Sequence, residues 1–191
     1  MVFEFVICCG GIFAALAVIA FFYLFTVYNG LIELRNNIDR AWANIDVMLK
    51  QRTDLIPNLV EVVKGYKNYE KGVLTELTRM RTSMISAKTP GEKAKASDAL
   101  SRSLKTVFAV AENYPELKAS QNFLELQKSL SGMENQIADR REFYNNSVLL
   151  YNNKIKSLPD MIIASALAFK EKEYFKATEE EKKAVKVKMD G

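Results

Sequence analysis

Histidine is absent from all 191 residues, and the only two cysteines stand side by side at Cys8 and Cys9. Without histidine, the chain cannot use His-based general acid–base catalysis, Ser-His or Cys-His nucleophile pairs, or the Glu-x-x-His ligands of di-metal bundles. Adjacent residues on a helix point about 100° apart, so a disulfide between the two cysteines is not expected. We interpret both cysteines as small apolar residues, with acylation as the alternative. Neither interpretation indicates the redox state of the compartment.

Glycine and proline are also scarce, with 8 and 4 residues respectively. No Gly-rich phosphate-binding loop is present, because Gly10-Gly11 lies in an apolar run and the other glycines are isolated. The net charge is only +4, and the basic residues are scattered among acidic ones rather than interleaved with aromatic residues. We therefore expect no nucleic-acid partner, no cofactor and no metal, and interpret the acidic run 179–181 as part of a solvated tail.

The segment Phe5–Val27 contains no charged residue. As a helix it is about 34 Å long, enough to cross a hydrocarbon core of about 30 Å. It is longer than the apolar part of a signal peptide, and Glu4 rather than a basic residue precedes it, so we expect a retained membrane anchor. Aromatic residues suited to a membrane interface follow toward its end: Phe21, Phe22, Tyr23 and Tyr28.

Basic residues flank this apolar segment on one side only. Arg35 and Arg40 follow it and none precedes it, so the positive-inside rule predicts a single-pass protein of the cell membrane with its N-terminus outside and its domain in the cytoplasm. The expected domains are a short N-terminus (1–4), the anchor (5–27), a helical bundle (28–175) and a mobile tail of mixed charge (176–191).

A repeat of alternating three- and four-residue steps runs from Leu31 to Met84, and its positions are apolar except for Arg35, Arg52 and Glu70. Such a repeat places one narrow stripe along a helix, which is typical of helices covered by partner helices. Pro57 lies within this stretch. We expect it to kink the helix without ending it, because it removes one backbone hydrogen bond and crowds a carbonyl one turn earlier.

Two further helices follow in the sequence. Residues 89–92 form a T-x-x-E capping box with proline at the first helical position, which predicts a helix start. That helix is expected to end at Tyr114. A third helix is expected from about Glu116 to Ser157, where Pro159 interrupts it before a short apolar segment.

The helix lengths distinguish two topologies. The first soluble helix either runs unbroken to Met84 or folds back near residues 65–68. We favour the fold-back, because it gives rods of about 51, 28, 30 and 60 Å that match as an up-down-up-down bundle. The expected class is all-α, with a single transmembrane helix continuous with an antiparallel, coiled-coil-like four-helix bundle. This topology returns four lysines to the membrane surface, where anionic lipid would attract each by ~1 kcal/mol: Lys154, Lys156, Lys170 and Lys172.

Charged residues on the apolar stripes are the unusual chemistry of this chain. We expect their stems to lie along the stripe while their head groups reach solvent or pair with acids such as Asp54 or Glu134. A partly buried anion site and a contact with a second subunit or another protein are the alternatives. The residues assigned to the seam of the bundle or its assembly are Arg35, Trp42, Arg52, Leu59, Tyr66, Glu70, Arg140 and Tyr144. A candidate docking motif is formed by Asp54, Leu55, Ile56, Pro57 and Asn58.

Several short motifs carry a family resemblance over nearly the whole chain. The most specific is D-L-I-P-N-L-V at 54–60. Others are Tyr28-Asn29, Ala41-Trp42, Ile45-Asp46-Val47, Leu49-Lys50, Arg52, Val63-Lys64-Gly65-Tyr66, Glu112-Asn113-Tyr114-Pro115, Leu117-Lys118-Ala119, Asn122-Phe123, Leu126-Gln127, Arg140-Arg141, Tyr144-Asn145, Tyr151-Asn152, Pro159 and Tyr174-Phe175. In these residues the chain resembles the LemA family of bacterial single-span membrane proteins.

The resemblance implies a helical bundle with an N-terminal anchor, an outward N-terminus and a cytoplasmic domain, and no enzymatic activity is established for the family. Some relatives act in organelle membrane formation, which suggests scaffolding or membrane shaping. The chain departs from the family pattern at Met48, where glutamine is usual, at Tyr69, where histidine is frequent, and at Leu158, where phenylalanine is frequent. The change at Tyr69 argues against any histidine-dependent role.

These observations favour a non-enzymatic, single-pass membrane protein that self-associates as a scaffold and organises or shapes the membrane. The expected partners are membrane lipid and further copies of the same chain. The alternative is a monomeric, membrane-tethered adaptor that docks a protein partner through Asp54–Asn58. A third hypothesis, an enzyme, would depend on Arg52 or Glu70.

Overall fold

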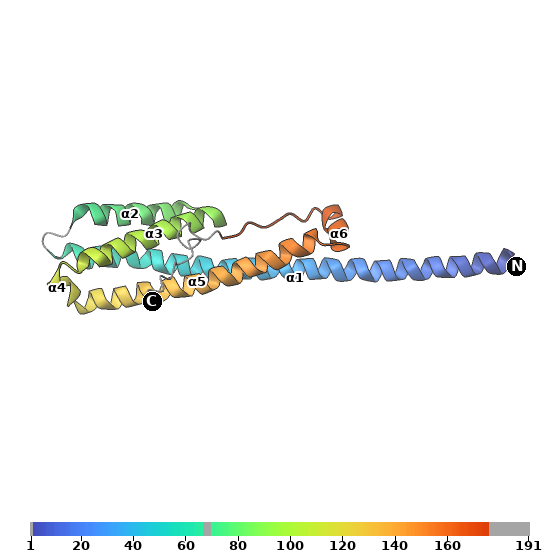
Figure 1. Cartoon of the computed structure of the whole chain (residues 1–191), viewed down its shortest axis with the longest axis horizontal. Helices are drawn as coiled ribbons and strands as arrows, with labels where there is room; N and C mark the ends of the chain where they lie inside the picture. The colour runs from blue at the N-terminus through green and yellow to red at the C-terminus, as the bar shows by residue number, and fades with distance from the viewer. Residues whose placement is uncertain (1, 67–69, 176–191) are drawn as a thin grey trace, which may run out of the picture. The chain divides into compact units, whose positions relative to one another are not determined.

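In a computed structural model, which describes residues 2–66 and 70–175 and side chains from Gly10 onward, the described residues form six helices and no strand (Figure 1). They are α1 (Val2–Lys64), α2 (Lys71–Ser86), α3 (Pro90–Ala111), α4 (Pro115–Lys118), α5 (Gln121–Lys156) and α6 (Asp160–Ala166). The predicted all-α class is confirmed. The chain divides into two compact units. Of the described residues, the anchor unit combines those up to Arg40 with Asn146–Lys172, and the bundle unit combines those between Ala41 and Asn145 with residues 173–175.

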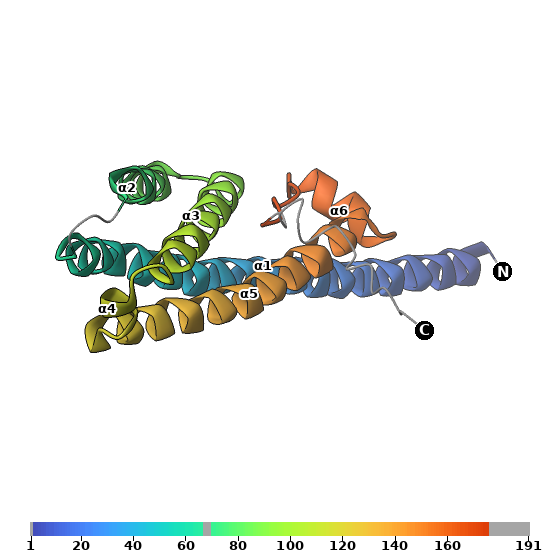
Figure 2. The ribbon, with the colours of Figure 1, turned by 60° about the vertical axis from the view of Figure 1, so that its left-hand side comes forward.

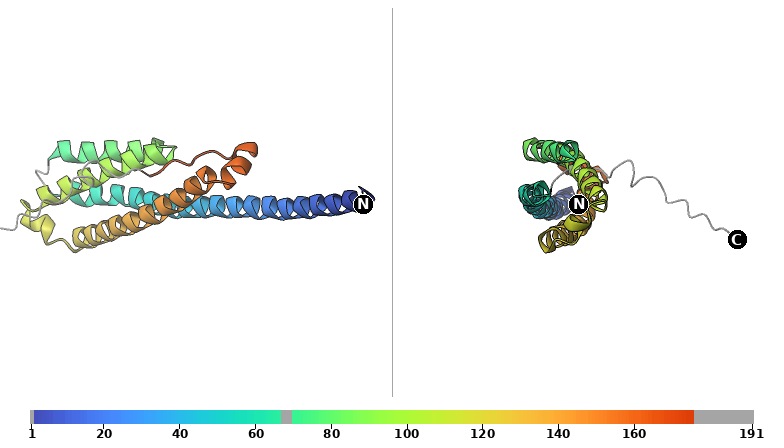
Figure 3. Two further views of the ribbon diagram at one scale, coloured as in Figure 1. Left: turned by 45° about the vertical axis from the view of Figure 1, so that its right-hand side comes forward. Right: turned by 90° about the vertical axis from the view of Figure 1, so that its left-hand side faces the viewer.

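The bundle unit has one apolar core, to which α1, α2, α3 and α5 contribute. Figure 3 shows the ribbons of these helices. Burying each large apolar side chain contributes about 1.5–3 kcal/mol, so this shared core is the main stabilising feature of the unit. Its large members are Ile56, Leu59 and Val63 of α1, Leu74, Leu77 and Met80 of α2, Leu100, Leu104 and Val107 of α3, and Phe123 and Leu130 of α5. The expected packing of these four helices is therefore confirmed.

The first turn of the bundle separates α1 from α2. Helix α1 ends at Lys64 and α2 begins at Lys71, so the fold-back is confirmed and a single helix to Met84 is wrong. Residues 67–69 of the expected turn lie outside the described residues. Glu70, assigned to the seam, is exposed at the N-cap position of α2. The apolar repeat continues across the turn because α2 has its own buried face, and periodicity alone cannot assign a stripe to one helix or two.

Pro57 lies inside α1, and the helix continues through it. A proline has no N–H, so the carbonyl four residues earlier, at Thr53, loses its helical donor. Arg81 of α2 supplies a replacement, because its Nε donates to Thr53 O at 3.2 Å. The proline thus frees the Thr53 carbonyl to accept the hydrogen bond from Arg81 that joins α1 to α2.

The start of α3 has the predicted capping box. The Glu92 N–H donates to Thr89 Oγ1 at 3.2 Å, and Glu92 Oε2 accepts from the Thr89 N–H at 3.2 Å and from the Lys88 N–H at 2.8 Å. These backbone hydrogen bonds lower the pKa of the Glu92 carboxyl. Reciprocal bonds of this kind satisfy donors that a helix start otherwise leaves unpaired.

The expectation of one helix from Glu116 to Ser157 is wrong at its beginning. The short helix α4 ends at Lys118, and α5 begins at Gln121. Serine is a preferred N-cap residue, and Ser120 O accepts the Leu124 N–H at 3.0 Å at the start of α5. The chain can therefore end one helix and begin another while Leu117 and Phe123 both join the core.

The anchor unit contains the apolar part of α1. From Gly10 onward α1 is long and apolar enough to cross a membrane. Its side chains are exposed along residues 10–26, and Phe13, for example, is 76% exposed. This stretch therefore differs from a core helix of a soluble protein, whose apolar residues are covered. In the same unit, α6 follows the end of α5 (Figure 2).

Candidate functional site

The bundle unit contains a buried charge at Arg52, whose side chain is 0% exposed. Its Nη1 donates to Ser101 Oγ at 3.0 Å, and its Nη2 donates to Ser97 Oγ at 2.6 Å and Ser97 O at 3.2 Å. Nη1 also pairs with the Glu134 carboxylate, which in turn accepts from Ser101 Oγ at 2.7 Å. One guanidinium thus joins α1 to α3 and α5.

A second ion pair extends this cluster. Arg141 Nη2 donates to Asp98 Oδ1 at 2.6 Å and to Ser97 Oγ at 3.2 Å. The Arg141 guanidinium also lies 4.6 Å from the centroid of the Phe175 ring, within the range of a cation–π contact. The cluster therefore links α3, α5 and the segment that contains Phe175.

Burial lowers the pKa of the Arg52 guanidinium, and the Glu134 carboxylate opposes that shift. An arginine remains protonated in proteins, so the group is a permanent buried cation that requires an anion. Glu134, one of the two acids expected as its partner, occupies the place that a bound anion would take. The geometry favours a structural ion pair over the anion-site alternative for Arg52.

The other seam residues are placed as follows. Leu59 and Tyr144 are buried, Trp42, Tyr66 and Arg140 are half-buried, and Arg35 is exposed like Glu70. Arg35 and Glu70 are thus uncovered within this chain, and their assignment to the seam of the bundle or its assembly stays a prediction. A long charged residue at the edge of an apolar stripe turns toward water unless a partner is buried with it.

Trp42 forms an aromatic cluster with two residues from distant parts of the bundle unit. Its ring centroid lies 5.7 Å from that of Tyr144 and 6.1 Å from that of Phe175. Lys93 Nζ lies 5.7 Å from the Trp42 ring and also pairs with Asp46. Phe175 is almost fully buried, so this cluster holds residues 173–175 within the bundle unit.

Two Tyr-Asn pairs on α5, seven residues apart, bind the backbone of residues 170–175. In the bundle unit, Tyr144 Oη donates to Glu173 O at 2.8 Å, and Asn145 bonds both the N–H and the carbonyl of Phe175 at 2.9 Å. In the anchor unit, Tyr151 Oη donates to Lys170 O at 3.0 Å, and Asn152 bonds both the N–H and the carbonyl of Lys172 at 2.9 Å. We call these four side chains the Tyr-Asn clamp.

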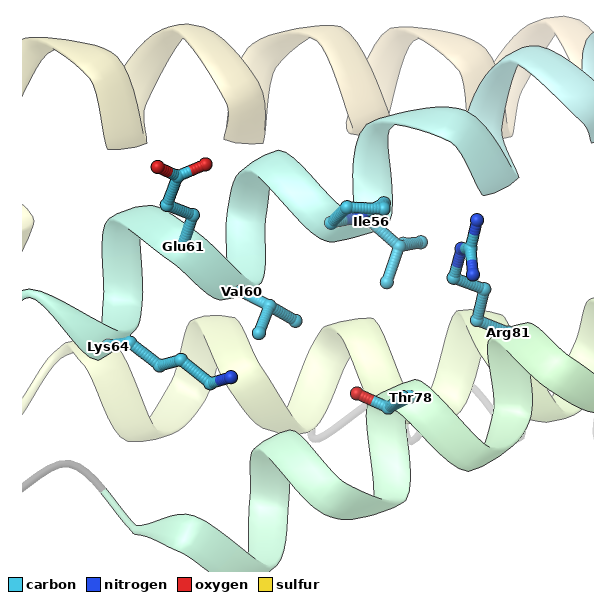
Figure 4. A pocket seen from close by; sticks show the side chains of 7 residues that line it. Ile56, Val60, Glu61, Lys64, Thr78 and Arg81 are labelled. Carbon is cyan, nitrogen blue, oxygen red and sulfur yellow. The ribbon is translucent and has the colours of Figure 1, made fainter.

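The candidate docking motif is split by burial. Ile56 is buried and Leu55 is partly buried, whereas Asp54, Pro57 and Asn58 are exposed. A groove of about 400 Å³ begins at Ile56 and Pro57 and continues between α1 and α2 (Figure 4). Its other lining residues are Val60, Glu61, Lys64, Thr78 and Arg81. The groove thus shares Ile56 and Pro57 with the motif expected from the sequence and extends along α1 to Lys64.

The four candidate lipid-contact lysines all belong to the anchor unit. Three of them form ion pairs: Lys154 with Asp160 at 2.7 Å, Lys156 with Glu171 at 2.7 Å and Lys172 with Asp39 at 3.8 Å. Lys170 is exposed and lines a groove of about 560 Å³ together with Arg35 and Lys172. Hydrogen bonds from Lys154 and from Tyr23 lower the pKa of the Asp160 carboxyl, so this group stays ionised at neutral pH.

Sequence reasoning assigned no role to the residues that complete these networks, although Arg141, Asn145 and Asn152 stand in the motifs of the family resemblance. The full set is Ser97, Asp98, Ser101 and Arg141 around Arg52, and Asn145 and Asn152 in the clamp. A signal existed for the clamp, because Tyr-Asn-Asn occurs twice at heptad spacing, at 144–146 and 151–153. The searched part of the chain, the residues that the structure describes, contains no group of three or more His, Cys, Asp or Glu able to hold a metal.

Comparison with known proteins places the chain in one family. The model of the LemA family matches residues 41–189. Magnetosome proteins MamQ 2 and MamQ 1 of Paramagnetospirillum magneticum are each 26% identical over 191 residues, covering 86% of this chain and 70% of the relative. Protein LemA of Metamycoplasma hominis is 27% identical over 158 residues, covering 81% and 71%. The family resemblance is confirmed, and the chain is a member of the LemA family.

Proposed function

We propose that this LemA-family protein is a non-enzymatic, single-pass membrane protein whose bundle self-associates as a scaffold that organises or shapes the membrane. The observation that carries this proposal is the continuity of α1, which includes both the exposed apolar stretch and the first helix of the bundle core. The bundle is thereby attached to the membrane without a linker. Two relatives named as magnetosome proteins support a role at an organised membrane.

The polar chemistry of the bundle is consistent with a structural role. The buried guanidinium is matched by an acid and two hydroxyls of the same chain, and the clamp binds a segment of the same chain. None of the names of the similar proteins is that of an enzyme. These groups stabilise the fold and leave the outer apolar residues for association.

Exposed apolar residues of the two long helices are candidates for contacts between copies. In the bundle unit they include Val47 of α1, and in the anchor unit they include Leu149 and Leu150 of α5, which are neighbours in the sequence. Apolar residues that remain exposed in a soluble domain mark surfaces for association when they lie together. We expect Leu150→Glu to weaken self-association while Leu59→Asp, at a fully buried position, unfolds the bundle.

The groove of Figure 4 favours a second candidate function, a membrane-tethered adaptor. The groove combines apolar residues with Glu61, Lys64 and Arg81, which could orient a protein segment that binds there. It includes Ile56 and Pro57 of Asp54–Asn58, the motif expected to dock a partner. In this case one copy of the chain would bind one partner protein.

One measurement separates the two functions. The full chain, with a mass of 21.7 kDa, is extracted from its native membrane into a mild detergent or nanodiscs and its particle mass is measured. Multiples of the chain mass, reduced by Leu150→Glu at unchanged helicity, are expected for the scaffold. A single copy with additional protein mass would contradict the scaffold and support the adaptor, and a single copy alone would contradict both.

A further inference from the structure

The segment from Ser157 to Phe169 contains only one charged residue, Asp160. The Asp160 carboxylate accepts hydrogen bonds from Lys154 Nζ at 2.7 Å and from Tyr23 Oη at 2.6 Å. The first contact neutralises its charge, and the second connects it to α1. The segment therefore has no uncompensated charge.

Helix α6 in this segment is apolar on both of its faces. It buries Ile163 and Ala164 against its own unit. Met161, Ile162, Ser165 and Ala166 lie at three- and four-residue spacing and are exposed, as are Leu158 before the helix and Leu167 after it. Ile162 is 65% exposed. Apart from the Ser165 hydroxyl, this exposed face is apolar, which is unfavourable in water and marks a contact surface.

Two contacts fix the level of this segment along α1. Tyr23, which holds Asp160, precedes the end of the apolar run at Val27 by about 6 Å of helix. Phe169 packs edge-on against Tyr28, with ring centroids 6.3 Å apart. The segment therefore lies beside the last turn of the apolar run and the first turn beyond it. This is the level at which a membrane-crossing α1 passes through the bilayer interface, where tyrosine is enriched.

We propose that the exposed face of α6, with Leu158 and Leu167, inserts into the interfacial layer of the bilayer beside the anchor. This inference rests on the membrane anchor of the proposed function. Lipid is the occupant that the observations favour, because the face lies at the level where the exposed apolar side chains of α1 end and has no uncompensated charge. Interfacial helices bury such faces about 5–10 Å into the headgroup–acyl boundary.

The charges beside α6 agree with a lipid surface. Arg35, Lys170 and Lys172, with one acid, Glu171, line the groove of about 560 Å³ formed by residues of α1, α5 and the segment that follows α6. Basic residues at this level attract anionic headgroups, whereas α6 itself offers apolar contact. The protein thus combines a crossing helix with a short second element at one interface.

Depth-dependent fluorescence quenching tests the inference. The full chain carrying Cys8→Ser and Cys9→Ser is reconstituted into vesicles of phosphatidylcholine and phosphatidylglycerol, with one NBD-labelled cysteine at a time. Ile162→Cys reports on α6 and Phe13→Cys on the anchor. Ile85→Cys of α2, at a position 60% exposed, is the matched control. We expect shallow lipid nitroxides to quench the label at Ile162, deep nitroxides to quench the label at Phe13, and both to leave the control several-fold less quenched.

Each other outcome overturns a different statement. In one outcome, the label at Phe13 is quenched and the label at Ile162 is as exposed to water as the control. This outcome overturns the inference and leaves the anchor intact. An Ile162 label that is shielded from water but not quenched by lipid nitroxides also overturns it, because a protein surface then covers α6. Absence of quenching at Phe13 overturns the anchor of the proposed function as well. Leu158→Cys serves as the second label position where Ile162→Cys does not reach the helicity of the parent chain.

Discussion

Arg52 holds a guanidinium among the apolar side chains of the bundle, where an unpaired charge costs several kcal/mol. Ser97, Ser101 and Glu134 satisfy its two terminal nitrogens, but the hydroxyls carry no charge and cannot balance the cation. The Glu134 side chain is 42% exposed, so water shares its negative charge with Arg52. The stability of this site therefore depends on both charges together. Removing one member alone has a different effect from removing both.

We expect Glu134→Leu to lower the free energy of unfolding by about 3 kcal/mol, because it leaves the buried Arg52 cation without its anion. The double variant Arg52→Met with Glu134→Leu is expected to recover to within about 1 kcal/mol of the parent, since it removes both charges. Urea unfolding of the full chain in mild detergent, followed by fluorescence of Trp42, the single tryptophan, measures both.

Glu142→Leu is the control for this prediction, because Glu142 is an exposed acid on the same helix. It should change the free energy of unfolding by less than about 0.5 kcal/mol, as surface substitutions usually do. A Glu134→Leu variant as stable as Glu142→Leu would show that the pair contributes nothing to the fold.

The sequence predicted some residues of the Arg52 site and not others, and the difference has a physical reason. Arg52 was found because a long charged residue at a heptad position conflicts with an apolar stripe. Ser97 and Ser101 were not found, because small hydroxyl residues fit any helix face and gain meaning only from the guanidinium beside them. The ion pair to Asp98 uses Arg141 rather than its neighbour Arg140, and adjacent helical positions differ by about 100° in direction.

Residues 170–175 form no regular secondary structure, yet their backbone is held by side chains of α5. Each asparagine of the Tyr-Asn clamp donates to one carbonyl and accepts from one N–H of the same residue, as a neighbouring strand would. Asn152 is almost fully buried, so its removal leaves a donor and an acceptor of Lys172 without partners. The segment is thus ordered by the clamp rather than by a backbone ladder.

We expect Asn152→Ala to accelerate hydrogen exchange of the Lys172 amide by about tenfold or more, since unsatisfied backbone groups cost ~1–3 kcal/mol. Asn153→Ala is the matched control, because Asn153 is the exposed last residue of the same Tyr-Asn-Asn repeat. Hydrogen exchange of the full chain, measured by mass spectrometry on peptides that cover residues 170–175, compares the two. Equal exchange in both variants would contradict the role of the clamp.

The starts of the helices were easier to predict than their continuity. Thr89–Glu92 has a cap whose hydrogen bonds are local, so the sequence contains all the information that places the start of α3. The break between α4 and α5 depends on packing Leu117 and Phe123 into one core, which is a tertiary effect. The apolar repeat of residues 31–84 likewise crosses a turn, because two antiparallel helices both face the same core.

The whole molecule has an asymmetric distribution of basic residues about its apolar helix. None precedes Phe5, whereas the anchor unit gathers six after Val27: Arg35, Arg40, Lys154, Lys156, Lys170 and Lys172. The orientation was predicted from the two arginines alone and the four lysines were expected at the membrane surface, and the fold brings Lys154 to the level of Tyr23 through Asp160. Acidic residues contribute little to the positive-inside rule, so their ion pairs with these lysines do not cancel the bias.

This distribution predicts that the N-terminus lies outside and the bundle unit lies in the cytoplasm. In the Cys8→Ser and Cys9→Ser background, we expect a membrane-impermeant maleimide to label Val2→Cys in intact cells and Ile85→Cys only after permeabilisation. Both positions are tested in the full chain, and Ile85 is exposed on α2, so lack of labelling there reports the membrane barrier rather than burial. Labelling of Ile85→Cys and not Val2→Cys in intact cells would reverse the orientation, and the six basic residues would then face the outer surface.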